Sequence, residues 1–172
     1  MPKVVYYDRR VVDATEVQFF HESRAKHPDK EFGTNMPLDA MWDHDFTIRK
    51  IVITVNPKLI SSTTAKDAAV DDEVVRMMND MIVQIQVGDM PVIYLPFDEC
   101  IASLEVTGSL QYTLATAADG SYSFMSVNKA NGQHGLDIDI SVPARTTFKF
   151  FIRSLSTPNL GKVTVKLFGE RP

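Results

Sequence analysis

The residues best suited to chemistry form a short polar cluster, Asp43-His44-Asp45, directly after Trp42. An imidazole flanked by carboxylates can bind a metal ion or act as a general base. Neighbouring side chains point in different directions, however, so the three do not easily converge on one reacting atom. We therefore expect this cluster to be a solvated loop before a strand rather than a catalytic centre.

A second pair of acids, Asp137 and Asp139, lies two residues apart, close enough to share a cation on one strand face. A calcium loop of the EF-hand type also needs a central glycine and a closing glutamate. Ile138 and Ile140 alternate with the acids instead, which is the pattern of a strand. We expect both carboxylates to face solvent.

The motifs of common enzyme classes are missing from the chain. It contains no G-x-S-x-G, G-x-x-x-x-G-K-[ST], H-E-x-x-H or G-x-G-x-x-G. The four histidines are His21, His27, His44 and His134, and no two have an H-x-H or H-x-x-x-H spacing. We predict a protein that is not an enzyme, with no catalytic residue, metal site or cofactor.

Length and composition predict one globular domain over residues 1–172. The chain is 44% hydrophobic and 23% charged, with a net charge of −4, which argues against direct nucleic-acid binding. Cys100 is the single cysteine and is expected to be a small buried hydrophobe. Residues 1–10 do not resemble a signal peptide, and no apolar run approaches the roughly 20 residues that span a bilayer. We expect synthesis and folding in a cytosol.

Alternation of apolar and polar residues is the main structural signal, and it predicts strands. The segments that show it are 83–87, 110–114, 136–142, 148–152 and 163–167, with shorter candidates at 17–19 and 122–124. Between Phe46 and Val55 the apolar phase changes face at Arg49-Lys50, which predicts a β-bulge or a crossing between sheets. Prolines bound the apolar run 91–96, which favours an edge strand.

One helix is expected over residues 66–81. Its apolar stripe has helical spacing, and Thr64 with Asp67 gives an approximate capping box. The stripe is Val70, Val74, Met77, Met78 and Met81. Residues 21–45 have neither period and are predicted to be a long, functional loop. About eight strands and one short helix predict an all-β antiparallel sandwich or jelly roll.

Several apolar residues fall in the polar, outward phase of their strands: Phe20, Ile82, Phe151 and Phe168. A group of such residues indicates surfaces that another molecule covers. We predict Phe20, Phe151 and Phe168 as interface residues.

The last third of the chain resembles the closing strands of a viral jelly-roll coat protein. The resemblance lies in Leu136–Ile140, in the V-P-A-R-T-T-F segment at 142–148, in Gly161–Gly169, and in the G-D-M-P-V segment at 88–92. The chain is thus similar to the small single jelly-roll capsid proteins of tailless icosahedral bacteriophages, above all those with an internal membrane.

This resemblance implies upright barrels packed into capsomers of a shell. The expected partners are copies of the chain itself, with or without a second coat protein, and a membrane beneath the shell. Lipid beneath the coat would explain the lack of a basic arm for the genome. The protein would be made in the host cytoplasm and end in the virion.

Two other functions remain open from the sequence. One is a ligand- or carbohydrate-binding β-sandwich, in which Trp42, Tyr94, Tyr112 and Tyr122 stack on sugars. The other is an enzyme that uses the cluster at residues 43–45.

Overall fold

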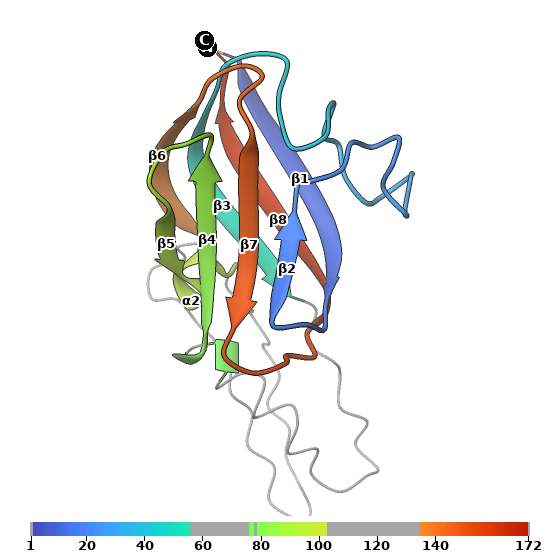
Figure 1. The fold of residues 1–172 in the computed structure, drawn as a ribbon, viewed down its shortest axis with the longest axis vertical. Helices are drawn as coiled ribbons and strands as arrows, with labels where there is room; N and C mark the ends of the chain where they lie inside the picture. Colours follow the sequence, from blue (N-terminus) through green and yellow to red (C-terminus); the bar gives the residue numbers. More distant parts are fainter. Residues whose placement is uncertain (1, 56–75, 78, 103–134, 172) are drawn as a thin grey trace, which may run out of the picture.

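The computed structural model describes residues 2–55, 76–77, 79–102 and 135–171. Within these residues the chain forms eight strands and the short helix α2, and residues 76, 77 and 79 are also helical (Figure 1). They are β1 (Lys3–Val12), β2 (Glu16–Phe19), β3 (Phe46–Val55), β4 (Met81–Val87), β5 (Ile93–Pro96), α2 (Phe97–Cys100), β6 (Leu136–Val142), β7 (Phe148–Ser154) and β8 (Gly161–Glu170).

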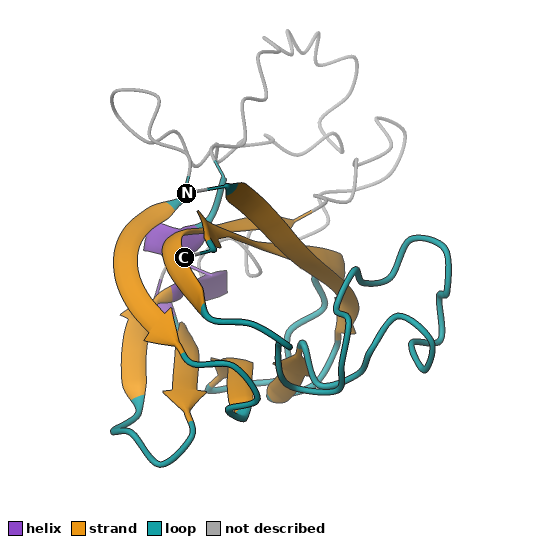
Figure 2. Ribbon diagram, turned by 90° about the horizontal axis from the view of Figure 1, so that it is seen from above, coloured by secondary structure: helices purple, strands orange, loops and turns teal. Residues whose placement is uncertain are grey.

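The strands make two four-stranded antiparallel sheets, with the orders β1-β8-β3-β6 and β2-β7-β4-β5. In both sheets, early strands pair with late ones: β1 with β8, β2 with β7, β3 with β6 and β4 with β5. Such a chain is one long hairpin wrapped around a barrel, and the wrapping also brings β8 beside β3 and β7 beside β4. This is the connectivity of a jelly roll. The predicted fold class is therefore confirmed, and Figure 2 shows the wrapped sheets from above.

The core lies between the two sheets, because each strand directs alternate side chains inward. Its centre is aromatic: the Trp42 ring lies 4.9 Å from that of Phe148 and 5.2 Å from that of Phe46. Phe150 and Phe19 extend the cluster, with centroids 6.1 Å apart. Burial of one such ring stabilises the fold by roughly 2 kcal/mol.

The predicted change of face in β3 is confirmed. The register of β3 shifts between Ile48 and Lys50 against both of its neighbours, β6 and β8. Ile48 lies on one side of this bulge and Ile51 on the other, and both are buried. The bulge lets one strand keep its apolar side chains inward while the sheet coils around the core.

The prediction of a helix over residues 66–81 is wrong at its C-terminal end. Residues 76, 77 and 79 are helical, but Met81 is the first residue of β4, where it faces the core. Residues 66–75 and 78, and the cap residues Thr64 and Asp67, lie outside the described part of the chain.

The other differences concern length and extent. β1, which has ten residues, and α2 were not among the elements predicted from the pattern of apolar residues. The strand candidates at 110–114 and 122–124 lie outside the described residues. The edge strand predicted within 91–96 is β5, at the border of its sheet. In the described ranges, no helix is both long and apolar enough to cross a bilayer.

Candidate functional site

The loop between β2 and β3, residues 20–45, lies along the outer edge of β1 (Figures 1 and 2). The Arg9 amide donates to the Gly33 carbonyl at 2.7 Å, and the Asn35 amide donates to the Tyr7 carbonyl at 3.2 Å. The Asn35 side chain accepts from the Tyr7 amide at 2.7 Å and donates to the Val5 carbonyl at 2.8 Å. The loop therefore covers a strand edge that would otherwise be open to pairing.

A buried carboxylate, that of Asp8, anchors this loop. Asp8 is 0% exposed. Its Oδ2 accepts from the Phe20 amide at 2.6 Å and from Arg10 Nε at 3.2 Å, and its Oδ1 accepts from the Arg9 amide at 3.0 Å. His27 Nε2 lies 3.3 Å from Oδ1. Because a buried charge is costly unless it is paired, these contacts fix the start of the loop against β1.

Sequence reasoning missed this anchor. The signal was present, because Asp8 and Arg10 share the inward phase of β1 with Tyr6 and Val12. A charged pair in the apolar phase of a strand indicates a buried polar contact with another segment. The sequence alone does not say that Phe20 and His27 supply it.

Two further carboxylates hold the loop. Burial alone would raise the pKa of Glu22, but a hydrogen bond from Arg10, 2.8 Å long, and its positive charge keep that pKa below its ordinary value. The Lys26 ammonium and the Ser23 amide bind Asp39 and lower its pKa from 3.8 to about 2. These contacts hold the loop in a defined conformation.

Phe20, predicted as an outward-facing interface residue, is instead 0% exposed. The backbone of Phe20 has φ = 58°, a left-handed conformation directly after the end of β2. This turn breaks the alternation, so that Phe19 and Phe20 both enter the core. Phe20 packs edge-on against Phe150, with centroids 5.8 Å apart. The prediction for Phe20 is wrong because it assumed that β2 continued.

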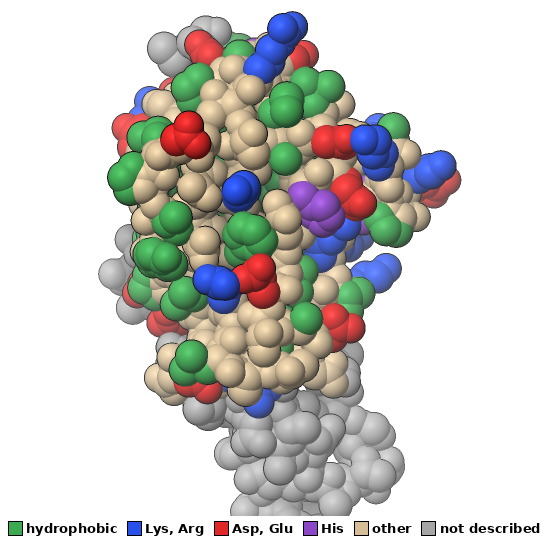
Figure 3. Space-filling view, in the orientation of Figure 1, with side chains coloured by type: hydrophobic (Ala, Val, Ile, Leu, Met, Phe, Trp, Pro, Cys, Tyr) green, Lys and Arg blue, Asp and Glu red, His purple; other side chains and the backbone are tan. Residues whose placement is uncertain are grey.

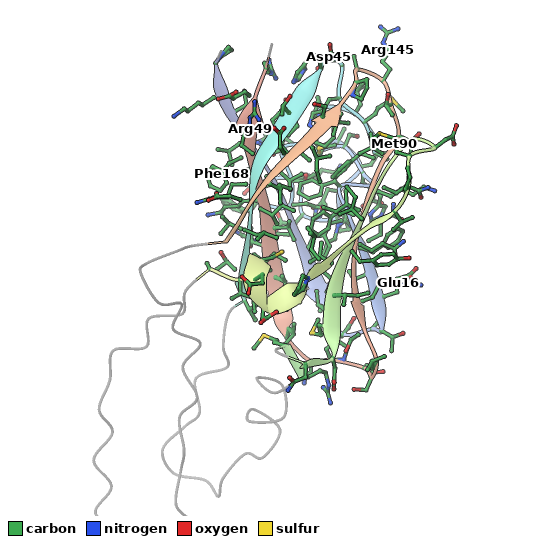
Figure 4. The ribbon with its side chains drawn as sticks, turned by 90° about the vertical axis from the view of Figure 1, so that its left-hand side faces the viewer. Glu16, Asp45, Arg49, Met90, Arg145 and Phe168 are labelled. Atoms are coloured by element: carbon green, nitrogen blue, oxygen red, sulfur yellow. The ribbon has the colours of Figure 1, made fainter. Side chains whose placement is uncertain are left out.

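Phe151 and Phe168 are both half-buried and lie on the outer faces of different sheets. Phe151 pairs across the sheet with Gln18 and Gln84, and Phe168 with Val5 and Lys50. In Figure 4, Phe168 lies on one side of the sandwich, and Glu16, which belongs to the sheet of Phe151, lies on the other. The two rings therefore belong to two separate surfaces.

The outer face of the sheet β2-β7-β4-β5 mixes apolar and charged groups (Figure 3). Ile82 is exposed, as predicted, and Tyr94 is 60% exposed. Between them and β2, Arg153 donates to Gln84 at 2.9 Å and lies 2.5 Å from a Glu16 oxygen. An interface on this face would combine apolar contacts with a fixed polar group.

The cluster at residues 43–45 does not converge on one point. Asp45 accepts a hydrogen bond from the Ala144 amide at 2.8 Å and so fixes the turn after β6. Asp43 binds His44, and that hydrogen bond lowers the pKa of Asp43 below its ordinary value. His44 Nε2 lies 3.0 Å from the hydroxyl of Tyr6.

Arg171 completes this chain of contacts by donating to the Tyr6 hydroxyl at 2.8 Å. No local pattern predicts that Tyr6 and Arg171 join the histidine, because they lie 165 residues apart in the sequence. Within the described ranges, no group of three or more His, Cys, Asp or Glu side chains is placed to hold a metal ion.

Asp137 and Asp139 are both exposed, as predicted, and each has its own cation. Lys50 lies 3.2 Å from Asp137, and Arg49 lies 2.6 Å from Asp139. Arg49 also reaches Glu170 at 3.5 Å. The two acids thus link β6 to β3 across the outer face of their sheet.

Of the aromatics proposed to stack on sugars, Trp42 is fully buried, so its part in that prediction is wrong. Tyr94 is exposed, and Tyr112 and Tyr122 lie outside the described residues. Cys100 is buried, as predicted.

Comparison of the chain with protein-family models, curated proteins and solved structures found no match.

Proposed function

We propose that the protein is a virion structural protein whose jelly-roll domains associate into an icosahedral shell. The observation that carries this proposal is the strand order, β1-β8-β3-β6 against β2-β7-β4-β5. Viral capsid domains are one of the main groups that use this architecture, with lectins and cupins. The coat-protein resemblance of residues 136–169 favours the first of these groups.

The surface of the sandwich is consistent with repeated contacts. Apolar side chains are exposed on both outer faces: Val5 and Val11 on one sheet, Ile82 and Tyr94 on the other. Covering one such side chain is worth roughly 1–2 kcal/mol, so each contact would be weak and the closed shell would gain its stability from repetition.

The chain would be made in the host cytoplasm and would function in the virion, with copies of itself and with or without a second coat protein. Its net charge of −4 favours a shell that does not bind the genome directly, such as one built over an internal membrane.

The direct test is the association state of the purified protein. Analytical ultracentrifugation over a concentration series, with electron microscopy of the most concentrated sample, should show oligomers, rings or shells. A chain that stays monomeric at every concentration, alone and with extract of infected host cells, contradicts the proposal.

A second function, carbohydrate binding, is favoured by one observation, the exposure of Tyr94 on the face of β4 and β5. A glycan array with wild-type protein and Tyr94→Ala tests it. Binding that disappears in the variant would support a lectin-like module, and an array without any bound glycan would reject it.

A further inference from the structure

The ordered loop at residues 20–45 carries a surface hollow of about 520 Å³. Its lining residues are Arg24, Ala25, Lys30, Asn35, Met36 and Pro37. Met36 and Asn35 are fixed by the contacts of the loop with β1, because Met36 is buried and Asn35 bridges Val5 and Tyr7. The hollow is therefore a preformed feature of the surface.

The two charged side chains that line this hollow, Arg24 and Lys30, are both cations. Arg24 and Lys30 are both exposed, and neither has a carboxylate within ion-pair distance among the residues that the structure describes. The Arg24 side chain donates a 3.3 Å hydrogen bond to the Lys30 carbonyl. Two cations without an ion-pair partner in the described part of the chain, beside the apolar Ala25 and Pro37, favour a partner that carries an acid next to an apolar group.

The turn between β4 and β5 has that chemistry. Asp89 and Met90 stand side by side at its tip, and Met90 is 58% exposed. Asp89 has no cation partner among the described residues. The tip is held in place because Gly88, at φ = 53°, donates its amide to the Thr147 carbonyl at 2.7 Å, and the Met90 amide donates to the Val87 carbonyl at 3.0 Å.

The hollow and the tip lie on opposite sides of the sandwich. The loop runs along the edge of β1, and the tip leads into β5, which is the far edge of the other sheet. Figure 1 shows the loop on the right and the β4–β5 turn on the left, both in the upper half of the molecule. Figure 4 shows Met90 at that upper end, pointing away from the core.

We propose that the Asp89–Met90 tip of one copy inserts into the Arg24–Lys30 hollow of the next copy. This inference rests on the proposed function, because it names a contact by which the subunits associate. A contact between two different surfaces is head-to-tail, so each subunit keeps one free hollow and one free tip. Such contacts continue until a rotation closes them into a ring.

Two variants that each lose one half of the contact provide the test. The hollow variant is Arg24→Glu with Lys30→Glu, and the tip variant is Asp89→Ser with Met90→Ser. Both change exposed residues, so both should fold. The matched control, Asp13→Ser with Ala14→Ser, alters the exposed turn at the other end of the sandwich.

Neither variant alone should form rings or chains, and the control should associate like wild type. An equimolar mixture of the two variants should give a 1:1 heterodimer and stop there, because one intact tip meets one intact hollow. Sedimentation velocity and native mass spectrometry distinguish this dimer from longer species.

A second measurement crosslinks the contact between tip and hollow instead of weakening it. Ala25→Cys in one copy and Met90→Cys in another should form an intermolecular disulfide under mild oxidation when mixed, and much more slowly when each is alone. The native Cys100 is buried and should not compete.

The outcomes separate the two proposals. If wild type associates, but both variants associate equally well or the mixture yields no heterodimer and no crosslink, the tip-and-hollow contact is wrong and the structural role stands. A free anion as the occupant of the hollow would give this same result. If wild type never associates, the proposed function fails and this contact fails with it.

Discussion

Asp8 is expected to have a large influence on stability. Its carboxylate is fully buried and is shared by β1, the start of the long loop and His27. Asp139, by contrast, is exposed and makes a surface pair with Arg49. The two acids therefore provide a matched test of how burial changes the contribution of an ion pair to the free energy of unfolding.

We expect Asp8→Ala to lower the free energy of unfolding by about 3–5 kcal/mol, because it leaves the buried Phe20 amide without its acceptor and removes one of the two carboxylates that pair with Arg10. Asp139→Ala should cost less than about 1 kcal/mol. Urea unfolding followed by tryptophan fluorescence measures both, since Trp42 is in the core. Similar losses for the two variants would show that Asp8 is not the anchor.

Gly33 is a second sensitive position. A Cβ atom there would lie 1.9 Å from His27 Nδ1 and 2.5 Å from the Asp29 carbonyl oxygen. His27 is buried and cannot move aside without leaving Asp8. Gly33→Ala should therefore release the loop, which would appear as faster amide exchange at Arg9 and Asn35, while β6 and β7 exchange as in wild type.

At the scale of elements, the order of the long loop depends on its acid groups. The pKa of Asp39 is lowered to about 2, so its contribution is complete above the ordinary value of 3.8 and is lost as the pH falls through 2. Glu22 acts in the same direction. The loop should thus be indifferent to pH between 8 and about 5 as far as these two groups are concerned.

The Ser23 amide, which donates to Asp39 at 2.7 Å, reports this titration directly. Its NMR shift should change with a midpoint near 2, and Asp39→Asn should abolish the transition. A midpoint at the ordinary value of 3.8 would mean that Lys26 and Ser23 do not hold the carboxylate in solution.

Local sequence patterns predicted most strands of the sandwich but not every strand end. Alternation located β4, β6, β7 and β8, and a change of phase located the bulge in β3, because both signals come from residues adjacent in the chain. Met81 was assigned to the helix because its spacing fits both a helical stripe and the inward phase of a strand. Phe20 was misplaced because one left-handed residue ends the alternation without a glycine to mark it.

Contacts between distant segments were the part that could not be predicted. Asp8 with His27, and Tyr6 with Arg171, are joined by the fold, and no local pattern connects their positions. The face on which Asp137 and Asp139 lie was predictable, whereas their partners Lys50 and Arg49 follow from the pairing of β6 with β3.

For the whole molecule, the two half-buried rings test whether the sheet faces take part in assembly. Phe151→Glu and Phe168→Glu each place a charge where the proposed shell would exclude water, at a cost of several kcal/mol per contact. Both variants should melt close to wild type and associate less at equal concentration, as measured by light scattering. Folded variants that associate like wild type would show that the interfaces lie elsewhere.

The positions of the Phe151 and Phe168 rings also predict how a variant with both substitutions should behave. Because Phe151 and Phe168 lie on opposite outer faces, their effects on association should add. A double variant no weaker than either single variant would indicate that only one face is used.

The place of β8 has a consequence for how the protein is made. β8 lies between β1 and β3 in its sheet, yet it is the last of the described strands to leave the ribosome. At roughly 5–20 residues per second, β1 waits on the order of ten seconds for its partner. Until then, β3 can pair with β6, but β1 cannot join that sheet. A nascent chain that stops before residue 161 would therefore lack the β1-β8-β3 sheet. Such a truncated subunit could not take part in an assembly that uses this sheet.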